Sequence, residues 1–104
     1  MTLTELATIL ESLGYPVRYD HFSSSPTLPF IIYTNPSDNT FGADNKVTYK
    51  TKNIDVEVYT KNKDSVLEAK IEKLFDDNEI FYDDPDEIFI QSENVYKRTY
   101  YITI

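Results

Sequence analysis

The sequence predicts an α+β domain in which two helices pack on one face of a mainly antiparallel sheet of four to six strands. Three observations support this fold class. Apolar residues recur at helical spacing near residues 3–13 and 64–77. Other short runs alternate apolar and polar residues or are wholly apolar, as strands do. Neighbouring strand-like runs are close enough along the chain to form hairpins, and hairpins produce antiparallel sheets.

The size and composition are those of one globular domain, residues 1–104. Hydrophobic residues make up 40% of the chain, a typical value for a folded protein. The absence of cysteine excludes disulfides, thiol catalysis and thiolate metal sites. The sequence shows no signal-peptide pattern and no apolar run of membrane-spanning length. We therefore expect a cytoplasmic protein with no membrane partner.

The first element is predicted to be an amphipathic helix over residues 3–13. Thr2 followed by Glu5 is a capping-box pattern at its start. Gly14 and then Pro16 end the helix. The apolar stripe consists of Leu3, Leu6, Ile9, Leu10 and Leu13. So short a helix is not stable alone and must pack this stripe on the sheet.

Two strands and a long loop are expected next. Residues 17–22 alternate in polarity, and residues 30–33 form an apolar run typical of a buried strand. Pro29 suits the first position of that second strand, where its missing N–H does least harm. Residues 35–45 are rich in turn-forming types, so we expect a polar loop there. Long loops are usually functional or mobile.

A hairpin is predicted over residues 47–58, with its turn at Lys52-Asn53. The register gives one apolar face, pairing Val47 with Val58, Tyr49 with Val56 and Thr51 with Ile54. The other face pairs Lys50 with Asp55 and Thr48 with Glu57. Lys-Asn is not a preferred two-residue turn, so a four-residue loop with the same pairing is an alternative.

The last third of the chain predicts a helix and a second hairpin. Asp64 caps a helix that runs to about Asp77, with an apolar face of Val66, Leu67, Ile71, Leu74 and Phe75. The hairpin joins roughly Glu87–Gln91 to 95–104 through a three-residue turn at 92–94. One face then carries Ile88, Ile90, Tyr96, Tyr100, Ile102 and Ile104, with Arg98 as a misfit.

The net charge of −8 is concentrated in one segment. Residues 62–94 hold eleven acidic residues and three lysines. The candidate acidic face comprises Asp76, Asp77, Glu79, Asp83, Asp84, Asp86 and Glu87. Such a face is either a solvated surface or a docking surface for a basic partner. An acidic face repels the phosphates of nucleic acid. We therefore expect neither sequence-independent nor sequence-specific binding of nucleic acid.

No catalytic, cofactor or metal site is expected. His21 is the only histidine, and adjacent residues of a strand point to opposite faces, so Asp20 should not orient it. The acidic run at 76–87 lacks the glycine that a calcium loop uses at its sharp turn. No glycine-rich phosphate loop is present. We therefore expect a non-enzymatic protein without a cofactor.

The strongest candidate for a functional segment is the centre of the predicted loop. This candidate assembly loop comprises Asn39, Phe41, Gly42, Ala43, Asp44 and Asn45. Phe41 is an aromatic residue beside a glycine in polar surroundings. It either folds back as a plug over the core or inserts into another protein as an anchor.

Four strings read together, PVRYDHF, LPFIIYT, FGADNKVTYK and VEVYTKNKD, resemble a family of small phage and prophage proteins of Gram-positive bacteria. The resemblance covers most of the chain, and FGADNK is its most distinctive part. These proteins are encoded near the major tail protein and are similar to tail terminators or head–tail joining proteins.

The resemblance implies a small α+β subunit that assembles into a ring, expected to be a hexamer, at the head-proximal end of the tail tube. The implied partners are the phage tail-tube protein and the head-completion protein. The implied locations are the host cytoplasm during assembly and the head–tail junction of the virion. An alternative is a small acidic protein-binding module, an inhibitor or adaptor, with a basic protein target.

Overall fold

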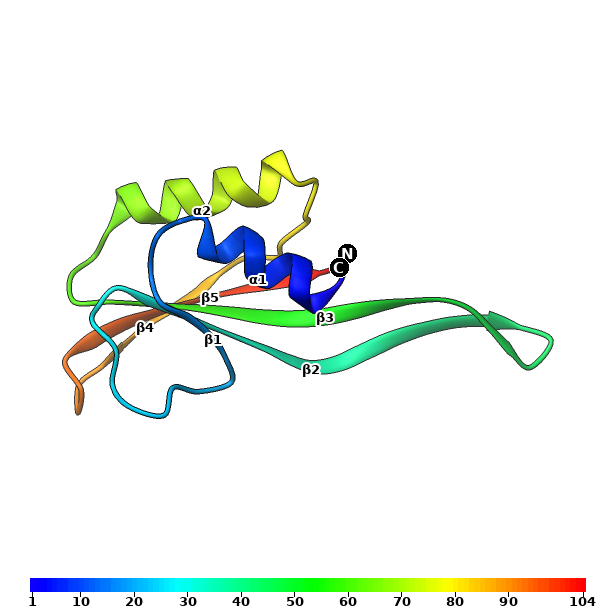
Figure 1. Ribbon diagram of the computed structural model, residues 1–104, viewed down its shortest axis with the longest axis horizontal. Helices are drawn as coiled ribbons and strands as arrows, with labels where there is room; N and C mark the ends of the chain where they lie inside the picture. The colour runs from blue at the N-terminus through cyan, green and yellow to red at the C-terminus, as the bar shows by residue number, and fades with distance from the viewer.

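The computed structural model describes residues 1–104, apart from the side chain of Thr48. Two helices, α1 (Leu3–Glu11) and α2 (Ser65–Asp77), lie on one face of a five-stranded sheet (Figure 1). The strands are β1 (Val17–Tyr19), β2 (Phe30–Ala43), β3 (Lys46–Thr60), β4 (Asp86–Ile90) and β5 (Val95–Thr103). Their order in the sheet is β1-β2-β3-β5-β4. Only β1 and β2 pair in parallel, so the predicted α+β class with a mainly antiparallel sheet is confirmed.

Both predicted helices are present with the predicted N-terminal caps, but α1 ends at Glu11, two residues before the predicted end at residue 13. The Thr2 side chain accepts a hydrogen bond from the Glu5 N–H, and Glu5 Oε1 accepts one from the Thr2 N–H, each at 3.1 Å. Asp64 is the N-cap of α2, and its Oδ1 accepts a hydrogen bond from the Leu67 N–H at 3.0 Å. One predicted core residue of α2 is wrong, because Val66 in the first turn is 68% exposed.

The core lies between the helices and the near face of the sheet. It is formed by Leu6, Leu10, Val17, Ile31, Tyr33, Ile54, Val56, Val58, Leu67, Ile71, Phe75, Ile80, Tyr100 and Ile102. The Phe75 ring meets Tyr100 and Tyr82 with centroids 5.6 and 5.7 Å apart. Burying each large side chain contributes about 1.5–3 kcal/mol, which holds both short helices in place.

The predicted loop at 35–45 and the predicted turn at Lys52-Asn53 are both wrong. β2 continues to Ala43, the chain turns at Asp44-Asn45, and β3 runs unbroken through Lys52 and Asn53. Asp44 and Asn45 have φ of 53° and 63°, the left-handed values that a two-residue hairpin turn requires. β3 therefore pairs with β2 rather than folding back on itself.

The new pairing also changes which residues share a face. Ile31 pairs with Val58 and Tyr33 with Val56 in the core, whereas Val47 and Tyr49 are each 57% exposed at the other end of β3. The predicted apolar face of residues 47–58 therefore does not exist. The side chain of Thr48, which the sequence paired with Glu57, lies outside the described part of the chain.

The second hairpin is present, but its register differs by one residue from the prediction. Ile90 pairs with Val95, so four residues, 91–94, connect the strands. A shift of one residue turns every side chain of a strand to the other face. Ile88 is consequently 51% exposed, and Glu87 lies opposite Arg98.

The predicted strand at 17–22 is also shorter than expected. β1 ends at Tyr19, because Asp20 adopts a φ of 66° and turns the chain out of the strand. The following segment, up to Pro29, loops under the face of the sheet that the helices leave open (Figure 1).

The β2–β3 hairpin extends well beyond the rest of the sheet. The N–H and C=O of Lys52 bond to Ile104 at 2.7 and 2.9 Å, and β5 pairs with β3 only from Asn53 onward. In the described strand pairings, residues 38–52 pair within the hairpin alone, apart from this contact. We call residues 38–52 the arm and the remainder the body. The arm gives the molecule its longest extent, 51 Å against 27 and 23 Å (Figure 1).

Candidate functional site

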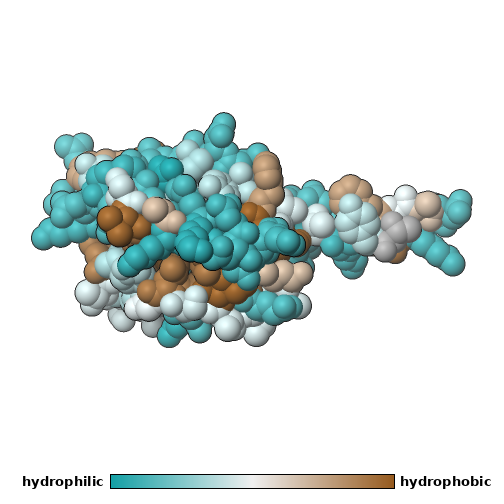
Figure 2. Space-filling model, turned by 90° about the horizontal axis from the view of Figure 1, so that it is seen from above, coloured by the Kyte–Doolittle hydropathy of each residue, from teal (hydrophilic) through white to brown (hydrophobic). Residues whose placement is uncertain are grey.

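The arm is the most distinctive feature of the structure, and it contains the whole candidate assembly loop. Figure 2 shows a narrow projection from the body on which hydrophobic and hydrophilic residues are interspersed. The six candidate residues from Asn39 to Asn45 lie on β2 and in the turn. They are brought together as an extended hairpin tip rather than as an irregular loop.

A polar network fastens the base of the arm. The register of β2 against β3 shifts between Thr34 and Ser37, where the chain leaves the body. Asn39 Nδ2 donates to Asn53 Oδ1 at 2.9 Å, and Asn53 Nδ2 donates to Asn39 Oδ1 at 3.2 Å and to Ser37 Oγ at 2.9 Å. Asn39 Nδ2 also reaches Thr51 Oγ1 at 3.1 Å. These cross-strand bonds hold the two strands together without a core beneath them.

An aromatic pair lies near the tip of the arm. The Phe41 ring stacks on Tyr49 with centroids 4.5 Å apart and planes 9° from parallel. Phe41 is 44% exposed and is not part of the buried core, so it is not a plug over the core. The structure thus contradicts the plug, and the anchor stays a prediction.

The position of Gly42, beside this pair, has no room for a side chain. A Cβ at this position would lie 2.2 Å from the Lys46 carbonyl oxygen, closer than real Cβ atoms approach. The register of the two strands shifts between Phe41 and Gly42, which brings the backbones together there. Glycine therefore shapes the tip in a way that no other residue can without distortion.

The charge of the arm is opposite in sign to that of the body. The arm carries Lys46, Lys50 and Lys52 against Asp38 and Asp44, a net charge of +1. Because the whole chain carries −8, the body carries −9. Lys52 Nζ lies 3.8 Å from Asp38 Oδ1 at the base, whereas Lys46 and Lys50 are exposed farther out.

The structure divides the candidate acidic face. Asp86 and Glu87 are neighbours in β4 and lie on opposite sides of the sheet. Asp86 accepts a hydrogen bond from the Tyr101 hydroxyl at 2.8 Å, and Asp77 pairs with Lys73 at 2.7 Å. The seven residues are thus not a single uniform surface.

All seven carboxylates are exposed, including these four: Asp76, Glu79, Asp83 and Asp84. None of the four takes part in an ion pair within the described part of the chain. Asp76 lies in the last turn of α2, where the helix dipole disfavours negative charge. Glu79, Asp83 and Asp84 lie on the segment that follows the helix. Phe81, which is 69% exposed, lies in the middle of this segment.

Sequence reasoning missed a charged cluster between α2 and the sheet. Lys63 Nζ lies 2.8 Å from both Glu68 and Glu87, and Arg98 lies 3.4 Å from Glu68, 3.7 Å from Glu87 and 3.9 Å from Glu72. The signal was present in the sequence. Glu68 and Glu72 are one helical turn apart, and Arg98 interrupts an apolar strand face.

A buried tyrosine completes the charged cluster. The Tyr100 hydroxyl donates to Glu72 Oε2 at 2.8 Å and accepts from Arg98 Nε at 3.0 Å. Burial raises the pKa of Tyr100 far above its usual value of 10.0, and the hydrogen bond to Glu72 raises the pKa further. Every carboxylate in the cluster faces a cation, so the arrangement acts as a clamp between α2 and β5.

The open face of the sheet carries a shallow cleft of about 640 Å³ under the segment from His21 to Leu28. His21 Nδ1 contacts Asp20 Oδ2 at 2.9 Å, so the expectation that Asp20 could not orient His21 is wrong. The two meet because the chain leaves the strand before Asp20. Both side chains are more than half exposed, and no described hydrogen bond joins His21 to a serine, so the geometry of a catalytic triad is not formed.

No model of a protein family matches the chain, and no curated protein matches it. Within the described residues, neither helix has the length and apolar character needed to cross a membrane. No group of three acidic or histidine side chains in the described part of the chain is arranged to hold a metal ion. The family resemblance therefore stays a prediction, and the geometry of the arm must support any functional proposal.

Proposed function

We propose that this chain is a non-enzymatic structural protein of a phage, a tail terminator or head–tail joining subunit. In this role it forms a ring at the head-proximal end of the tail tube. The observation that carries the proposal is the arm, a two-stranded projection that the fold of the body does not need. Isolated two-stranded hairpins are marginally stable in water. An arm of this kind gains stability when another protein covers it.

The tip of the arm has the features of a protein contact. The stacked Phe41 and Tyr49 rings and the exposed Val47 offer apolar area within polar surroundings. Aromatic residues of this type supply much of the binding energy in protein interfaces. A ring subunit must contact two neighbours through different surfaces, and an arm that reaches away from the body is suited to one of these contacts.

The sheet edges support the same proposal. β4 is an edge strand, with Ile88 51% and Phe89 46% exposed. Exposed, partly apolar edges are positions where a further strand can add. A subunit with an unpaired edge at one side and an arm at one end has several surfaces available to tube and ring partners.

The test is assembly with the tail-tube protein that the proposal names as partner. The mass of the purified chain should be measured alone at high concentration and in a mixture with tube protein. A ring-sized oligomer should form in at least one of these two samples. Electron microscopy should place the oligomer at one end of the tubes. A chain that remains monomeric with the tube protein, and that is absent from purified virions, would refute the proposal.

The acidic binding module remains a second candidate because of the four unpaired carboxylates near Phe81. A module that binds a basic protein through these groups would lose its partner as ionic strength rises. Removal of the arm would leave that binding intact, whereas it should abolish ring assembly. The arm deletion described in the Discussion therefore separates the two functions.

A further inference from the structure

The arm must find its binding surface on another molecule. It extends from the body along the longest axis of the structure, and its tip points away from both helices (Figure 1). The exposed residues of the tip include an aromatic stack, Phe41 on Tyr49, and two lysines on β3, Lys46 and Lys50. A matching surface would offer an exposed apolar side chain surrounded by carboxylates.

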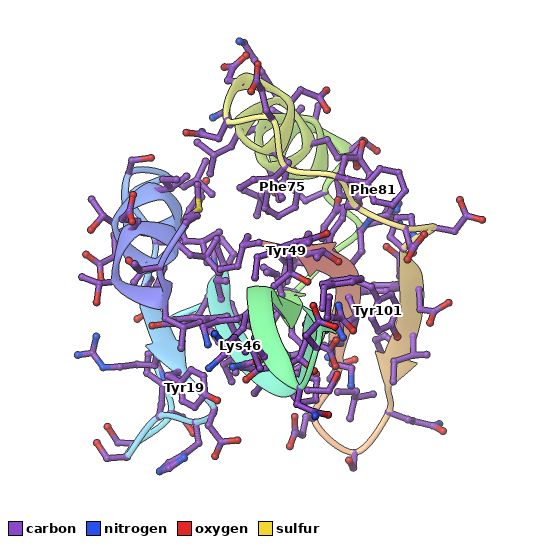
Figure 3. The ribbon with its side chains drawn as sticks, turned by 90° about the vertical axis from the view of Figure 1, so that its right-hand side faces the viewer. Tyr19, Lys46, Tyr49, Phe75, Phe81 and Tyr101 are labelled. Carbon is purple, nitrogen blue, oxygen red and sulfur yellow. The ribbon has the colours of Figure 1, made fainter. Side chains whose placement is uncertain are left out.

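The body presents such a surface. Phe81 is 69% exposed on the segment that follows α2, with Glu79 before it and Asp83 and Asp84 after it. We call these four residues the Phe81 surface. Figure 3, viewed along the arm, shows Lys46 and Tyr49 on the arm and Phe81 on this segment of the body. The three carboxylates lack ion pairs within the described residues, in contrast to Asp77 and Glu87 nearby.

We infer that the arm of one copy of this chain docks on the Phe81 surface of a second copy. This inference rests on the proposed function and names the surface that receives the arm. The charges favour a second copy, because an arm of +1 belongs to the same chain as a body of −9. Each copy offers one arm and one Phe81 surface. Because these two surfaces differ, the contact can repeat from copy to copy and close into a ring.

The physical basis combines apolar burial with charge. The Phe41–Tyr49 stack covers the Phe81 ring, which removes apolar area of both partners from water. Lys46 and Lys50 approach the carboxylates around Phe81 and speed the encounter at low salt. The contact therefore weakens as ionic strength rises.

The experiment exchanges the charges of the two surfaces. The arm-reversed variant carries Lys46→Glu and Lys50→Glu, and the surface-reversed variant carries Asp83→Lys and Asp84→Lys. A matched control, Lys61→Glu with Lys70→Glu, makes the same change of net charge at exposed positions of the body. Self-association is measured by sedimentation velocity over a range of concentrations at low salt, and circular dichroism verifies folding.

Each reversed variant alone should self-associate at least about 10-fold more weakly than the unchanged chain, because like charges then meet. An equal mixture of the two variants should recover association to within about 3-fold, since each arm again meets a surface of opposite charge. The Lys61→Glu, Lys70→Glu control should associate like the unchanged chain.

The outcomes separate this inference from the proposed function. If both reversed variants associate like the control, the inference is overturned while the ring function stands. The same holds if reversal of the arm weakens binding to the tail-tube protein but leaves self-association unchanged, because the tube protein is then the occupant. If the unchanged chain neither self-associates nor assembles with tube protein, both proposals fail.

Discussion

Single residues determine whether the arm can form. The turn needs two consecutive residues in the left-handed conformation, and Asp44 and Asn45 adopt it with φ of 53° and 63°. Asp and Asn tolerate this conformation better than other residues with a Cβ. Gly42 then allows the backbones of the two strands to approach closely. The same short stretch places Phe41 on Tyr49, so the conformation of the tip and its exposed aromatic stack depend on each other.

Replacing Phe41 with Ala should impair assembly and leave the fold nearly unchanged. Phe41 is 44% exposed and lies outside the core, so its loss creates no cavity. The melting temperature of the isolated chain should change by less than about 3 °C, which corresponds to well under 1 kcal/mol. Ring formation with the tube protein, measured by mass, should fall by about 10-fold or more.

Phe75→Ala serves as the contrasting variant. Phe75 is fully buried, and its removal should destabilise the chain by about 3–5 kcal/mol. A large drop in melting temperature for Phe41→Ala, comparable to that for Phe75→Ala, would show that Phe41 belongs to the folding core.

Stability should fall at alkaline pH because of buried tyrosines. Burial raises the pKa of Tyr59 from 10.0 to about 12, and the neighbouring Glu57 acts in the same direction. The folded state thus holds the proton more tightly than the unfolded state. Below pH 10 the stability is unaffected by this group, and between about pH 10 and 12 the unfolded state ionises first and stability is lost.

Urea denaturation at several pH values from 8 to about 12 measures this effect. Tyr59→Phe removes the ionisable group, so the free energy of unfolding should decline less steeply with pH in this variant. The decline that remains arises from groups such as Tyr100, whose pKa is also raised. An equally steep decline in Tyr59→Phe would contradict the assignment to this residue.

At the scale of elements, α2 is held by a clamp as well as by its apolar face. Glu68 and Glu72 on α2 face Arg98 on β5, and Lys63 before α2 bridges Glu68 to Glu87 on β4. Arg98 was the misfit of the predicted hairpin. The pattern of apolar residues alone favours the wrong register, because it takes no account of the charged partners of Arg98. Glu87 lies opposite it in the same hairpin, whereas Glu68 and Glu72 lie far away in sequence.

Arg98→Met should lower the free energy of unfolding by about 1–3 kcal/mol. This is less than the cost of breaking a fully buried ion pair, because the Arg98 side chain is 22% exposed. Glu68 and Glu87 would then share only the Lys63 cation, and Glu72 would lose the one cation that it faces among the described ion pairs. Lys73→Met is the matched control, because Lys73 pairs with Asp77 on the exposed side of the same helix, and its loss should leave the free energy of unfolding nearly unchanged. Equal effects of the two substitutions in urea denaturation would show that the clamp contributes nothing.

At the scale of the whole molecule, the body and the arm are two distinct parts of the chain. The body holds the core, both helices and the five-stranded part of the sheet. No described side chain of the arm belongs to the core cluster. We therefore expect this projecting hairpin to serve contact with another molecule rather than folding.

Deleting the arm should leave a folded body that cannot assemble. Ser37 and Asn53 pair across the base, so residues 38–52 can be replaced by an Asn-Gly turn. The shortened chain should melt within about 5 °C of the full chain, which corresponds to roughly 1 kcal/mol. It should form no ring with the tube protein.

Two results would contradict this view of the arm. Ring formation by the shortened chain would show that the arm is not an assembly element. Collapse of the shortened chain would show that the arm supports the fold of the body. Retained binding to a basic protein, together with loss of rings, would favour the acidic binding module.

The sequence by itself determined the elements whose signals are local. Thr2 with Glu5, Asp64 and the apolar stripes sufficed for both helices and the α+β class, because caps and helical spacing act within a few residues. Only the tertiary structure decided the pairing of β3. The apolar side chains of β3, from Ile54, Val56 and Val58, could be buried against more than one partner strand. Pairing with β2 is favoured because β2 adds Ile31 and Tyr33 to the same core. The arm then follows, since a register set in the body continues through the polar residues of β2 and β3 up to the turn at Asp44-Asn45. These polar residues have no buried face to mark them as strands, so in isolation they are typical of a loop.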